Sequence, residues 1–427
     1  MPRCMVLANG MPGSAYGNAD CQVMRMTFIA PLHRFDAVLP GRPPMPEAWR
    51  QARSVLLVRL DNLGDVLMCT PALKAVRQAL PHARLSLLAS PSGAALAPYL
   101  PMVDEVLVHE ASWVKGPGMS LPAGDPASDE ALLTRLRAGR FDAAVIFTTL
   151  TQSALPMAML CRLAGIPLRL AHVRENPYGL LSTWAKERDV LGPGMRHEVQ
   201  RQLALLCEVG MPAPRDDRLV MALDERHRRD AREALREAGL PAGQPYVLLH
   251  PGATAASRRY PAKEFGEVAR TLHTAGWACV FCGGPDEQAL VHEALGQGQG
   301  GALDLSGAWP LGTFAALIEG ARLLIGNNSG PMHMAAALGT PVVCLYALTN
   351  PQHTPWRVPS RVLYREVPCR DCLQSVCPQA GHGCLRGVEA DEVAQAALAL
   401  LGEHLSGIEA PGVGDEGEAR HTSTETA

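Results

Sequence analysis

The hydrophobic positions of this chain fall into short continuous runs, separated by stretches with helical spacing. The first run is SVLLVRL at 54–60, followed by the polar turn DNLGD and the amphipathic stretch VLMCTPALKAVRQAL at 66–80. A continuous apolar run of this kind is typical of a strand buried in a parallel sheet. Pro71 lies inside the amphipathic stretch, so we expect that helix to start or kink there. The runs RLSLLAS, DEVLVHE and FDAAVIFTT predict further strands.

The same alternation begins again in the second half of the chain. YVLLHPG starts it at residue 246, a helix is predicted over about 262–275, and WACVFCGG, RLLIGN and PVVCLYA predict more strands. The charged helical stretch 224–240 ends in the break PAGQP, which separates the two halves. Strands that alternate with helices indicate an α/β fold with parallel, doubly wound sheets.

These patterns divide the chain into four parts. Residues 1–50 form an N-terminal extension to which we assign no order. Residues 51–243 and 244–405 each form one α/β domain, and residues 406–427 are a predicted disordered tail. Ligands of such domains bind in the crevice at the carboxyl ends of the strands. Functional residues are therefore expected in the turns that follow strands.

The composition narrows the class of function. The 427 residues include 39 Lys and Arg against 42 Asp and Glu, with 5% aromatic residues. A chain with so little basic excess and so few stacking side chains is not expected to bind nucleic acid. No apolar run reaches the ~18–20 residues that span a bilayer, and no secretory signal is evident, so we expect a cytoplasmic protein. The sequence carries no signal for an oligomeric state.

The first turn, DNLGD, contains Asp61, Gly64 and Asp65. Gly64 permits close approach of another backbone, and Asp65 stands at the start of the following helix. Two interpretations fit Asp65: it caps that helix, or its carboxylate faces the crevice as a functional group. The turn argues against an NAD-dependent oxidoreductase, because it lacks the glycine fingerprint and presents carboxylates instead.

Two turns in the second half carry candidate phosphate-binding chemistry. NNSGPMH at 327–333 joins a strand to a helix with Pro331 in its first turn, and free N–H groups at a helix start favour an anion such as a diphosphate. An ordinary capped turn, with His333 in the core, is the alternative. HPGAT at 250–254 is followed by Arg258, whose charge could reach phosphate oxygens or could simply be solvated.

In their order and spacing these motifs resemble glycosyltransferase family 9, the ADP-heptose:lipopolysaccharide heptosyltransferases. The resemblance covers roughly residues 54–400 and is carried by VLLVRLDNLGDVLMCTPALKAVRQAL, FDAAVIF, the His-Glu pair of MRHEVQRQLALL, HPGAT with RRYP, FCGGPDE, LIGNNSGPMHMAAALGTPVVCLY and LTNP. It implies a GT-B fold, in which two Rossmann-like parallel-sheet domains face each other across a crevice. It also implies inverting, metal-independent transfer of heptose from ADP-heptose to a sugar hydroxyl of the lipopolysaccharide inner core.

The resemblance also assigns roles to residues. Asp65 corresponds to the general base, and Asp61 and Gly64 belong to the acceptor-side turn. The donor-side residues that it implies are Thr254, Arg258, Asn328, Ser329, Gly330 and His333. The implied partners are an ADP-sugar donor and a lipopolysaccharide precursor at the cytoplasmic face of the inner membrane, and no cofactor is required for catalysis.

Three positions depart from the family's usual pattern. Asn328 stands where an Asp that contacts donor-sugar hydroxyls is usual, and Ala347 and Asn350 stand where Gly and Asp are usual. An amide donates and accepts hydrogen bonds but carries no charge. The alternatives are therefore a relative that uses another nucleotide sugar or a protein acceptor, and a non-catalytic GT-B scaffold. Retention of Asp65 argues against the scaffold.

Four of the twelve cysteines form a cluster, and the other eight are expected to be reduced and mostly packed in the core. The cluster is Cys369, Cys372, Cys377 and Cys384, with His382 nearby. This spacing predicts a structural tetrathiolate site for zinc or iron, with two disulfides or free thiols as the alternative. The resemblance adds that many family members carry cysteines here and that one branch binds iron through them.

Overall fold

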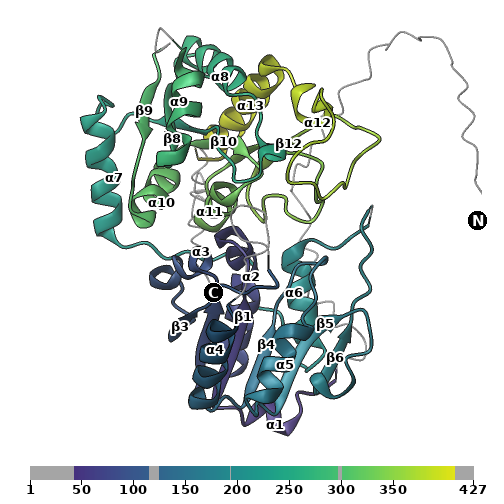
Figure 1. The fold of residues 1–427 in the computed structure, drawn as a ribbon. Coiled ribbons are helices and arrows are strands. Elements are labelled where there is room, and N and C mark those ends of the chain that lie inside the picture. Colours follow the sequence, from purple (N-terminus) through teal and green to yellow (C-terminus); the bar gives the residue numbers. More distant parts are fainter. Residues whose placement is uncertain (1–42, 115–124, 193, 297–300, 409–427) are drawn as a thin grey trace, which may run out of the picture.

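The computed structural model describes residues 43–114, 125–192, 194–296 and 301–408. Two α/β units lie one above the other, each built on a parallel sheet (Figure 1). The sheet orders are β3-β2-β1-β4-β5-β6 and β12-β11-β10-β7-β8-β9. Followed from its β9 edge, the second sheet repeats the order of the first, which is the Rossmann order. The predicted fold class is confirmed.

The first unit combines a six-stranded sheet with helices on both faces. The strands are β1 (Ser54–Arg59), β2 (Arg84–Ala89), β3 (Glu105–Val108), β4 (Ala143–Ile146), β5 (Leu168–Val173) and β6 (Thr183–Lys186). The helices are α1 (Glu47–Arg50), α2 (Leu63–Ala79), α3 (Pro91–Ala94), α4 (Pro126–Gly139), α5 (Leu155–Leu163) and α6 (Glu198–Cys207), with 3-10 turns η1 (Ala97–Tyr99) and η2 (Tyr178–Leu180). Nearly every residue of β1 and β4 is buried, as their continuous apolar runs predict.

Helix α2 begins at Leu63 and runs through Pro71, so the expectation that it starts at Pro71 is wrong. Proline has no N–H and leaves the carbonyl four residues earlier without its helical partner. Here the Thr70 hydroxyl donates a hydrogen bond to the Leu67 carbonyl (2.6 Å) and takes that place. The early start brings DNLGD directly onto the helix N-terminus.

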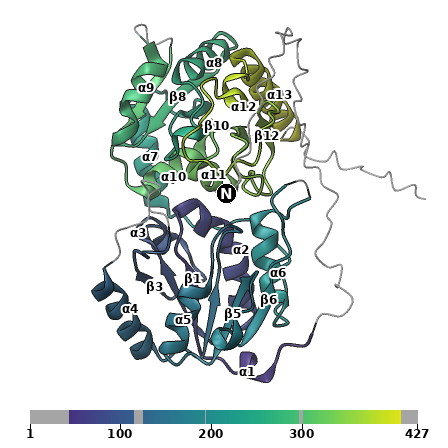
Figure 2. The same ribbon diagram turned by 45° about the vertical axis from the view of Figure 1, so that its right-hand side comes forward.

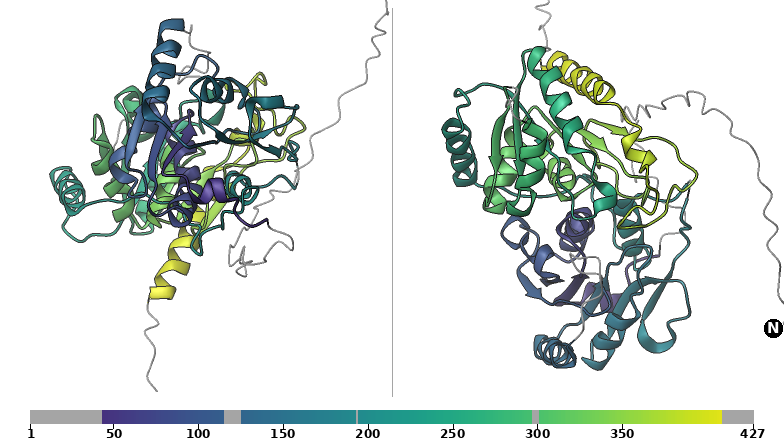
Figure 3. Two further views of the ribbon diagram at one scale, coloured as in Figure 1. Left: turned by 90° about the horizontal axis from the view of Figure 1, so that it is seen from below. Right: turned by 45° about the horizontal axis from the view of Figure 1, so that its top comes forward.

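The second unit repeats this architecture. Its strands are β7 (Tyr246–His250), β8 (Ala278–Gly283), β9 (Leu303–Ser306), β10 (Leu323–Asn327), β11 (Val342–Leu345) and β12 (Ser360–Leu363). Its helices are α8 (Ala262–Thr274), α9 (Gln288–Leu295), α10 (Leu311–Gly320), α11 (Gly330–Leu338), α12 (Gly383–Arg386) and α13 (Ala390–Ile408), with 3-10 turns η3 (Ala256–Arg258) and η4 (Pro285–Glu287). Helix α13 packs against α8 on the outer side of this unit (Figure 3).

The limits of the folded units differ in detail from the predicted ranges. Helix α7 (Glu225–Glu237) falls within the predicted first domain but packs against α10 of the second unit, where Arg228 and Glu319 form an ion pair of 2.7 Å. Trp49 of α1 is 1% exposed, so the first unit includes residues of the predicted extension. Helix α13 makes residues 406–408 of the predicted tail helical. Residues 1–42 and 409–427 lie outside the described part.

The two units are joined by contacts as well as by the chain. The Glu198 N–H at the start of α6 donates to the Gln352 carbonyl (3.1 Å), and Arg357 forms an ion pair with Asp217 (2.9 Å). The His197 ring stacks on Trp356 with ring centroids 4.5 Å apart. Among the described residues, no helix is both long and apolar enough to cross a membrane.

Candidate active site

The N-termini of α2 and α11 meet at the junction of the two units (Figures 1 and 2). Each helix follows the central strand of its sheet, β1 or β10, so both starts lie at carboxyl ends of strands. A Cβ atom at Gly64 would lie 2.8 Å from His333 Cδ2 and 3.6 Å from Gly330 Cα. The first unit's motif and the second unit's motif are therefore in contact, and only glycine fits at position 64.

Arg59, the last residue of β1, holds three carboxylates in the first unit. Its guanidinium is fully buried and lies 2.7 Å from Asp61, 2.8 Å from Glu198 and 3.3 Å from Asp65. Burial disfavours its charge, but the surrounding acidic groups raise the pKa of Arg59 well above its usual value. Arg59 is therefore permanently positively charged and lies at the buried bottom of the site.

The Asp65 carboxylate caps α2 and also contacts Arg59. One carboxylate oxygen accepts the Asn62 backbone N–H (3.2 Å), which caps α2, and the other contacts Arg59. The side chain is 15% exposed, so an acceptor can reach it. Burial and the charge of Glu198 raise the pKa of Asp65, whereas Arg59 and Arg258 lower it. A carboxylate with a raised pKa is suited to accept a proton near neutral pH.

Asp61 lies beside Asp65 and is more deeply buried. Burial, Asp65 and Glu198 raise the pKa of Asp61 to about 6, against the opposing effects of Arg59 and of a short hydrogen bond from the Gln152 amide. Gln152 belongs to the loop that follows β4. The turn DNLGD is thus tied to a neighbouring loop of the same unit.

Glu198 supplies the third carboxylate from the start of α6. It is fully buried, and the Gln202 amide donates a hydrogen bond to it (2.6 Å). Burial would raise the pKa of Glu198, but the positive charges of Arg59 and Arg201 and the nearby His353 lower it to about 2. Glu198 therefore stays ionised and neutralises part of the charge of Arg59.

Asn327 joins the turns that follow β7 and β10. It ends β10, and its side-chain oxygen accepts the Tyr260 N–H (2.9 Å) while its amide donates to the carbonyls of Pro251 (2.8 Å) and Gly252 (3.2 Å). The motif HPGAT after β7 is thereby fixed beside the motif NNSGPMH after β10. The two turns form one surface of the second unit.

Arg258 faces the first unit from this surface. It closes η3, is half-buried, and its charge lowers the pKa of Asp65 across the junction. Thr254 is exposed in the same loop. Ser329 stands at the N-cap of α11 but makes no side-chain cap, because its hydroxyl donates to the Asn327 carbonyl (3.3 Å). The positive end of α11 is left without an acidic or side-chain cap, as an anion site requires.

Two predicted donor residues are buried rather than open to the junction. Asn328 is 1% exposed, and its Nδ2 has no hydrogen-bond partner among the described residues. His333 is 4% exposed, and burial together with His353, His197 and Arg258 lowers its pKa well below the usual value. His333 is therefore neutral and packs against Gly64.

Comparison with known proteins identifies the family of the chain. The sequence profile of glycosyltransferase family 9 (heptosyltransferase) matches residues 130–382. The chain belongs to glycosyltransferase family 9. It is 28% identical over 326 residues to Lipopolysaccharide heptosyltransferase 3 of Escherichia coli, covering 72% of this chain and 89% of that protein. It is 27% identical over 329 residues to Lipopolysaccharide heptosyltransferase 1 of Pseudomonas aeruginosa, covering 76% and 87%.

Solved structures of family 9 agree with the fold. The family 9 glycosyl transferase of Veillonella parvula superimposes with a TM-score of 0.66 at 23% identity, over 82% of this chain and 97% of that one. The E. coli ADP-heptose lps heptosyltransferase II gives a TM-score of 0.62 at 23% identity, over 82% and 99%. These likenesses show a GT-B fold, and the family membership makes the protein a glycosyltransferase.

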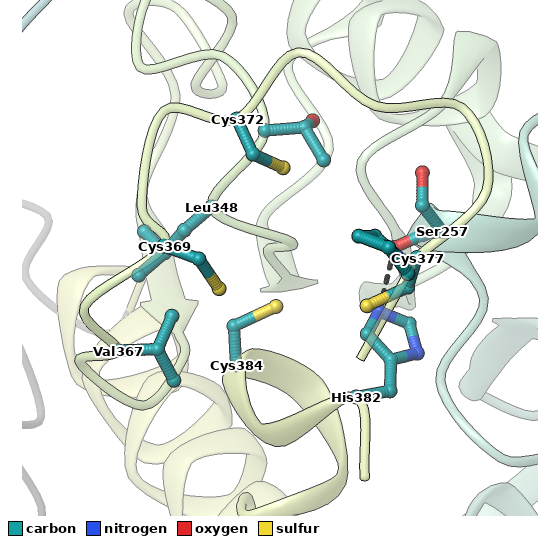
Figure 4. Close-up of a pocket in the computed structure, with 10 residues that line it drawn as sticks. Ser257, Leu348, Val367, Cys369, Cys372, Cys377, His382 and Cys384 are labelled. Carbon is teal, nitrogen blue, oxygen red and sulfur yellow. Dashed lines mark hydrogen bonds between the residues drawn. The ribbon is translucent and has the colours of Figure 1, made fainter. Parts of the chain in front are cut away.

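The cysteine cluster of this family 9 chain lines one pocket, with all four side chains around it (Figure 4). The four thiols are free. Within the described residues, no group of three or more His, Cys, Asp or Glu side chains is arranged to hold a metal ion. The thiol chemistry suits a soft metal, but the arrangement does not fit the predicted tetrathiolate site, and we derive no step through a metal.

Arg59, Gln152, Glu198 and His353 belong to the site but carried no predicted role. Arg59 and Glu198 lie inside motifs that the family resemblance quotes, RLDNLGD and the His-Glu pair, so a signal for both was present. The sequence carries no such signal for Gln152 or His353. They reach the site only because their loops lie beside DNLGD and α6 in the folded chain.

Proposed function

We propose that this family 9 glycosyltransferase transfers a heptose from ADP-heptose to a sugar hydroxyl of the lipopolysaccharide inner core, with inversion at the anomeric carbon. The observation that carries the proposal is the contact between the start of α2, which bears Asp65, and the start of α11 across the junction. Asp65 takes the acceptor proton while the hydroxyl attacks the anomeric carbon from the face opposite the departing ADP. One unit supplies the base, and the other binds the leaving group.

The donor binds to the second unit in this proposal. Negative charge grows on the ADP diphosphate as the glycosidic bond breaks. The N–H groups at the start of α11, from Gly330 onward, and the guanidinium of Arg258 lie on the surface that faces Asp65 and can meet this charge. Thr254 contributes a hydroxyl from the adjoining loop. These groups are fixed in the protein before the reaction, so their orientation costs little when the charge develops.

The acceptor binds to the first unit. A hollow of about 120 Å³ lies at the carboxyl ends of β4 and β5 and is lined by Thr151, Gln152, Arg174 and Glu175 among others. Gln152 also donates a hydrogen bond to Asp61, so the hollow adjoins the turn that carries the proposed base Asp65. Hydroxyl, amide and charged groups of both signs suit a polyhydroxylated, anionic sugar.

The outer edge of the first sheet fits a lipid surface that carries such an acceptor. Trp184 and Lys186 are exposed on one face of the edge strand β6, and Arg162 reaches from α5 to the Gly179 carbonyl beside the exposed Tyr178. Aromatic and cationic side chains together suit an anionic membrane interface, and we place the enzyme at the cytoplasmic face of the inner membrane.

Asp65→Asn tests the proposal. We expect turnover to fall by ~10²-fold or more, because the amide cannot accept the proton, while the donor dissociation constant changes little. The assay follows ADP release and product mass with ADP-heptose and with a panel of other nucleotide sugars. Unchanged turnover would remove the base assignment. Transfer from a different nucleotide sugar, or to a protein acceptor, would replace the substrate but keep the base.

A further inference from the structure

The cysteine-bearing segment 369–384 braces the turn that carries Arg258. Ser257, the residue before it, donates its hydroxyl to the Gln374 carbonyl (2.7 Å) and its backbone N–H to the next carbonyl along the segment (3.0 Å). The Nε2–H of His382 donates to the Ser257 carbonyl (2.8 Å). Ser257 is 2% exposed, so every polar group of this residue is satisfied by the segment. The position of Arg258 therefore depends on it.

The same segment also holds the loop that follows β11. The Asp371 N–H donates to the Leu348 carbonyl (2.7 Å), and the Leu373 N–H donates to the Thr349 carbonyl (2.9 Å). Asp371, Leu373 and His382 have positive φ angles of 57°, 54° and 43°. Residues other than glycine rarely adopt this conformation unless surrounding contacts impose it. The segment is thus kept in shape by the loops it braces.

The four thiols pack on the inner side of this brace. The pocket between them is also lined by Leu348, Val367 and Ser257 (Figure 4). Burial and the proximity of the other three cysteines raise the pKa of Cys384. Reduced thiols behave there as small apolar groups, which close the gap between the segment and the donor-side loops.

The cysteines of this cluster are better placed for thiol chemistry than the cysteines of the core. Burial raises the pKa of Cys161 and Cys279 to about 12, and Cys69, Cys282 and Cys344 are buried as well. A thiol that is buried and has a raised pKa is a poor nucleophile. Cys369, by contrast, is exposed at the rim of the pocket.

We propose that the cluster is a thiol-modification site that controls donor binding. The Cys369 thiolate attacks one sulfur of a low-molecular-weight disulfide such as oxidised glutathione. The disulfide bond of the reagent breaks, a mixed disulfide with Cys369 forms, and one glutathione thiolate leaves. Cys369 also lines the pocket, and in this inference the bulk of the added group displaces the segment, so that its hydrogen bonds to Ser257 are lost and Arg258 is no longer held. This inference rests on the donor role proposed for Arg258.

The test uses the full chain with Cys4, Cys21 and Cys207 replaced by Ser, so that the cluster is the accessible thiol group. The protein is treated with oxidised glutathione, the modified residue is mapped by mass spectrometry, and ADP binding is measured by calorimetry before treatment, after it, and after reduction with dithiothreitol. Loss of one or two positioning hydrogen bonds should raise the dissociation constant of ADP about 5–10-fold, and reduction should restore it. The same protein with Cys369→Ser should bind ADP equally well with and without treatment.

Hydrogen exchange of residues 256–258 separates this inference from the proposed function. Modification should speed exchange in η3 whether or not ADP binds. Bound ADP should lower the equilibrium constant for mixed-disulfide formation by the same factor by which modification weakens ADP binding. Faster exchange in a protein that binds no ADP before treatment would support the brace and refute the donor site. Full modification of Cys369 with unchanged exchange and unchanged ADP affinity would overturn the inference, as would failure of the cluster to react.

Discussion

Neutralising Glu198 tests whether the buried charges around Arg59 also stabilise the first unit. This carboxylate is fully buried, lies 2.8 Å from Arg59 and is 3.9 Å from Arg201. Burial opposes its ionisation, but the two guanidinium groups prevail and lower its pKa from 4.5 to about 2. Glu198→Gln keeps the shape of the side chain and removes only the charge. In this variant Arg59 keeps two carboxylate partners, Asp61 and Asp65, whose pKa values are raised.

The pKa of Glu198 gives the expected magnitude. A fall from 4.5 to about 2 in the folded protein corresponds to about 3 kcal/mol in favour of the charged form. Because the folded value is the lower one, this stabilisation is complete above the unfolded pKa and is lost as the pH falls from 4.5 toward 2. We therefore expect Glu198→Gln to cost about 3 kcal/mol at pH 7 and about half of that at pH 3, in line with breaking a buried ion pair.

Urea unfolding followed by tryptophan fluorescence, at pH 7, 4 and 3, measures this cost. Glu319→Gln is the matched control, because Glu319 also pairs with an arginine (Arg228, 2.7 Å) but is 29% exposed. A pair of that exposure is worth about 1 kcal/mol or less. A cost for Glu198→Gln below about 1 kcal/mol at pH 7, or one that is the same at all three pH values, would refute the reasoning.

Two further predictions concern the junction and the edge of the first sheet. Gly64→Ala places a methyl group 2.8 Å from His333 Cδ2, so we expect about 1–3 kcal/mol of destabilisation by thermal unfolding and lower turnover, both partly restored by adding His333→Ala. Wild-type stability in the single variant would show that the two helix starts do not touch. Trp184→Ala with Lys186→Glu should reduce cosedimentation with phosphatidylglycerol vesicles by about tenfold or more while leaving turnover on a detergent-free soluble acceptor unchanged. Equal vesicle binding would remove this surface from the membrane contact.

The strands at the centre of each sheet could be predicted, but β5 was missed although four of its six residues are buried. β1 and β10 are continuous apolar runs because helices cover both sides of the central strands. β6 was not singled out, since this edge strand is four residues long and alternates exposed and buried positions. β12 was missed for another reason: Arg361 interrupts its apolar pattern, yet is 6% exposed because it pairs with Glu403 of α13 (2.6 Å). An ion pair between residues this far apart in the sequence has no local signature.

The residues of the site also divide into those that the sequence could predict and those that it could not. DNLGD and NNSGPMH could be found because a turn between strand and helix needs particular residues, and Gly64 proves to be demanded by His333 of the other unit. The sequence could not show how the four cysteines lie, because their spacing suits either a metal site or a packed thiol pocket. Nor could it show that Glu198 would reach Arg59, which lies 139 residues earlier in the chain. Contacts of that range depend on the packing of α6 against α2.

The contact between Arg59 and Glu198 bears directly on the proposed base. Burial has the largest effect and raises the pKa of Asp65, whereas Arg59, 3.3 Å away, lowers it. Glu198 remains ionised beside the same guanidinium and raises the pKa of Asp65 in opposition to it. Glu198 touches no reacting atom in the proposed mechanism. Its part is to occupy Arg59, so that Asp65 is held in position by the arginine and still retains the proton affinity that a general base needs.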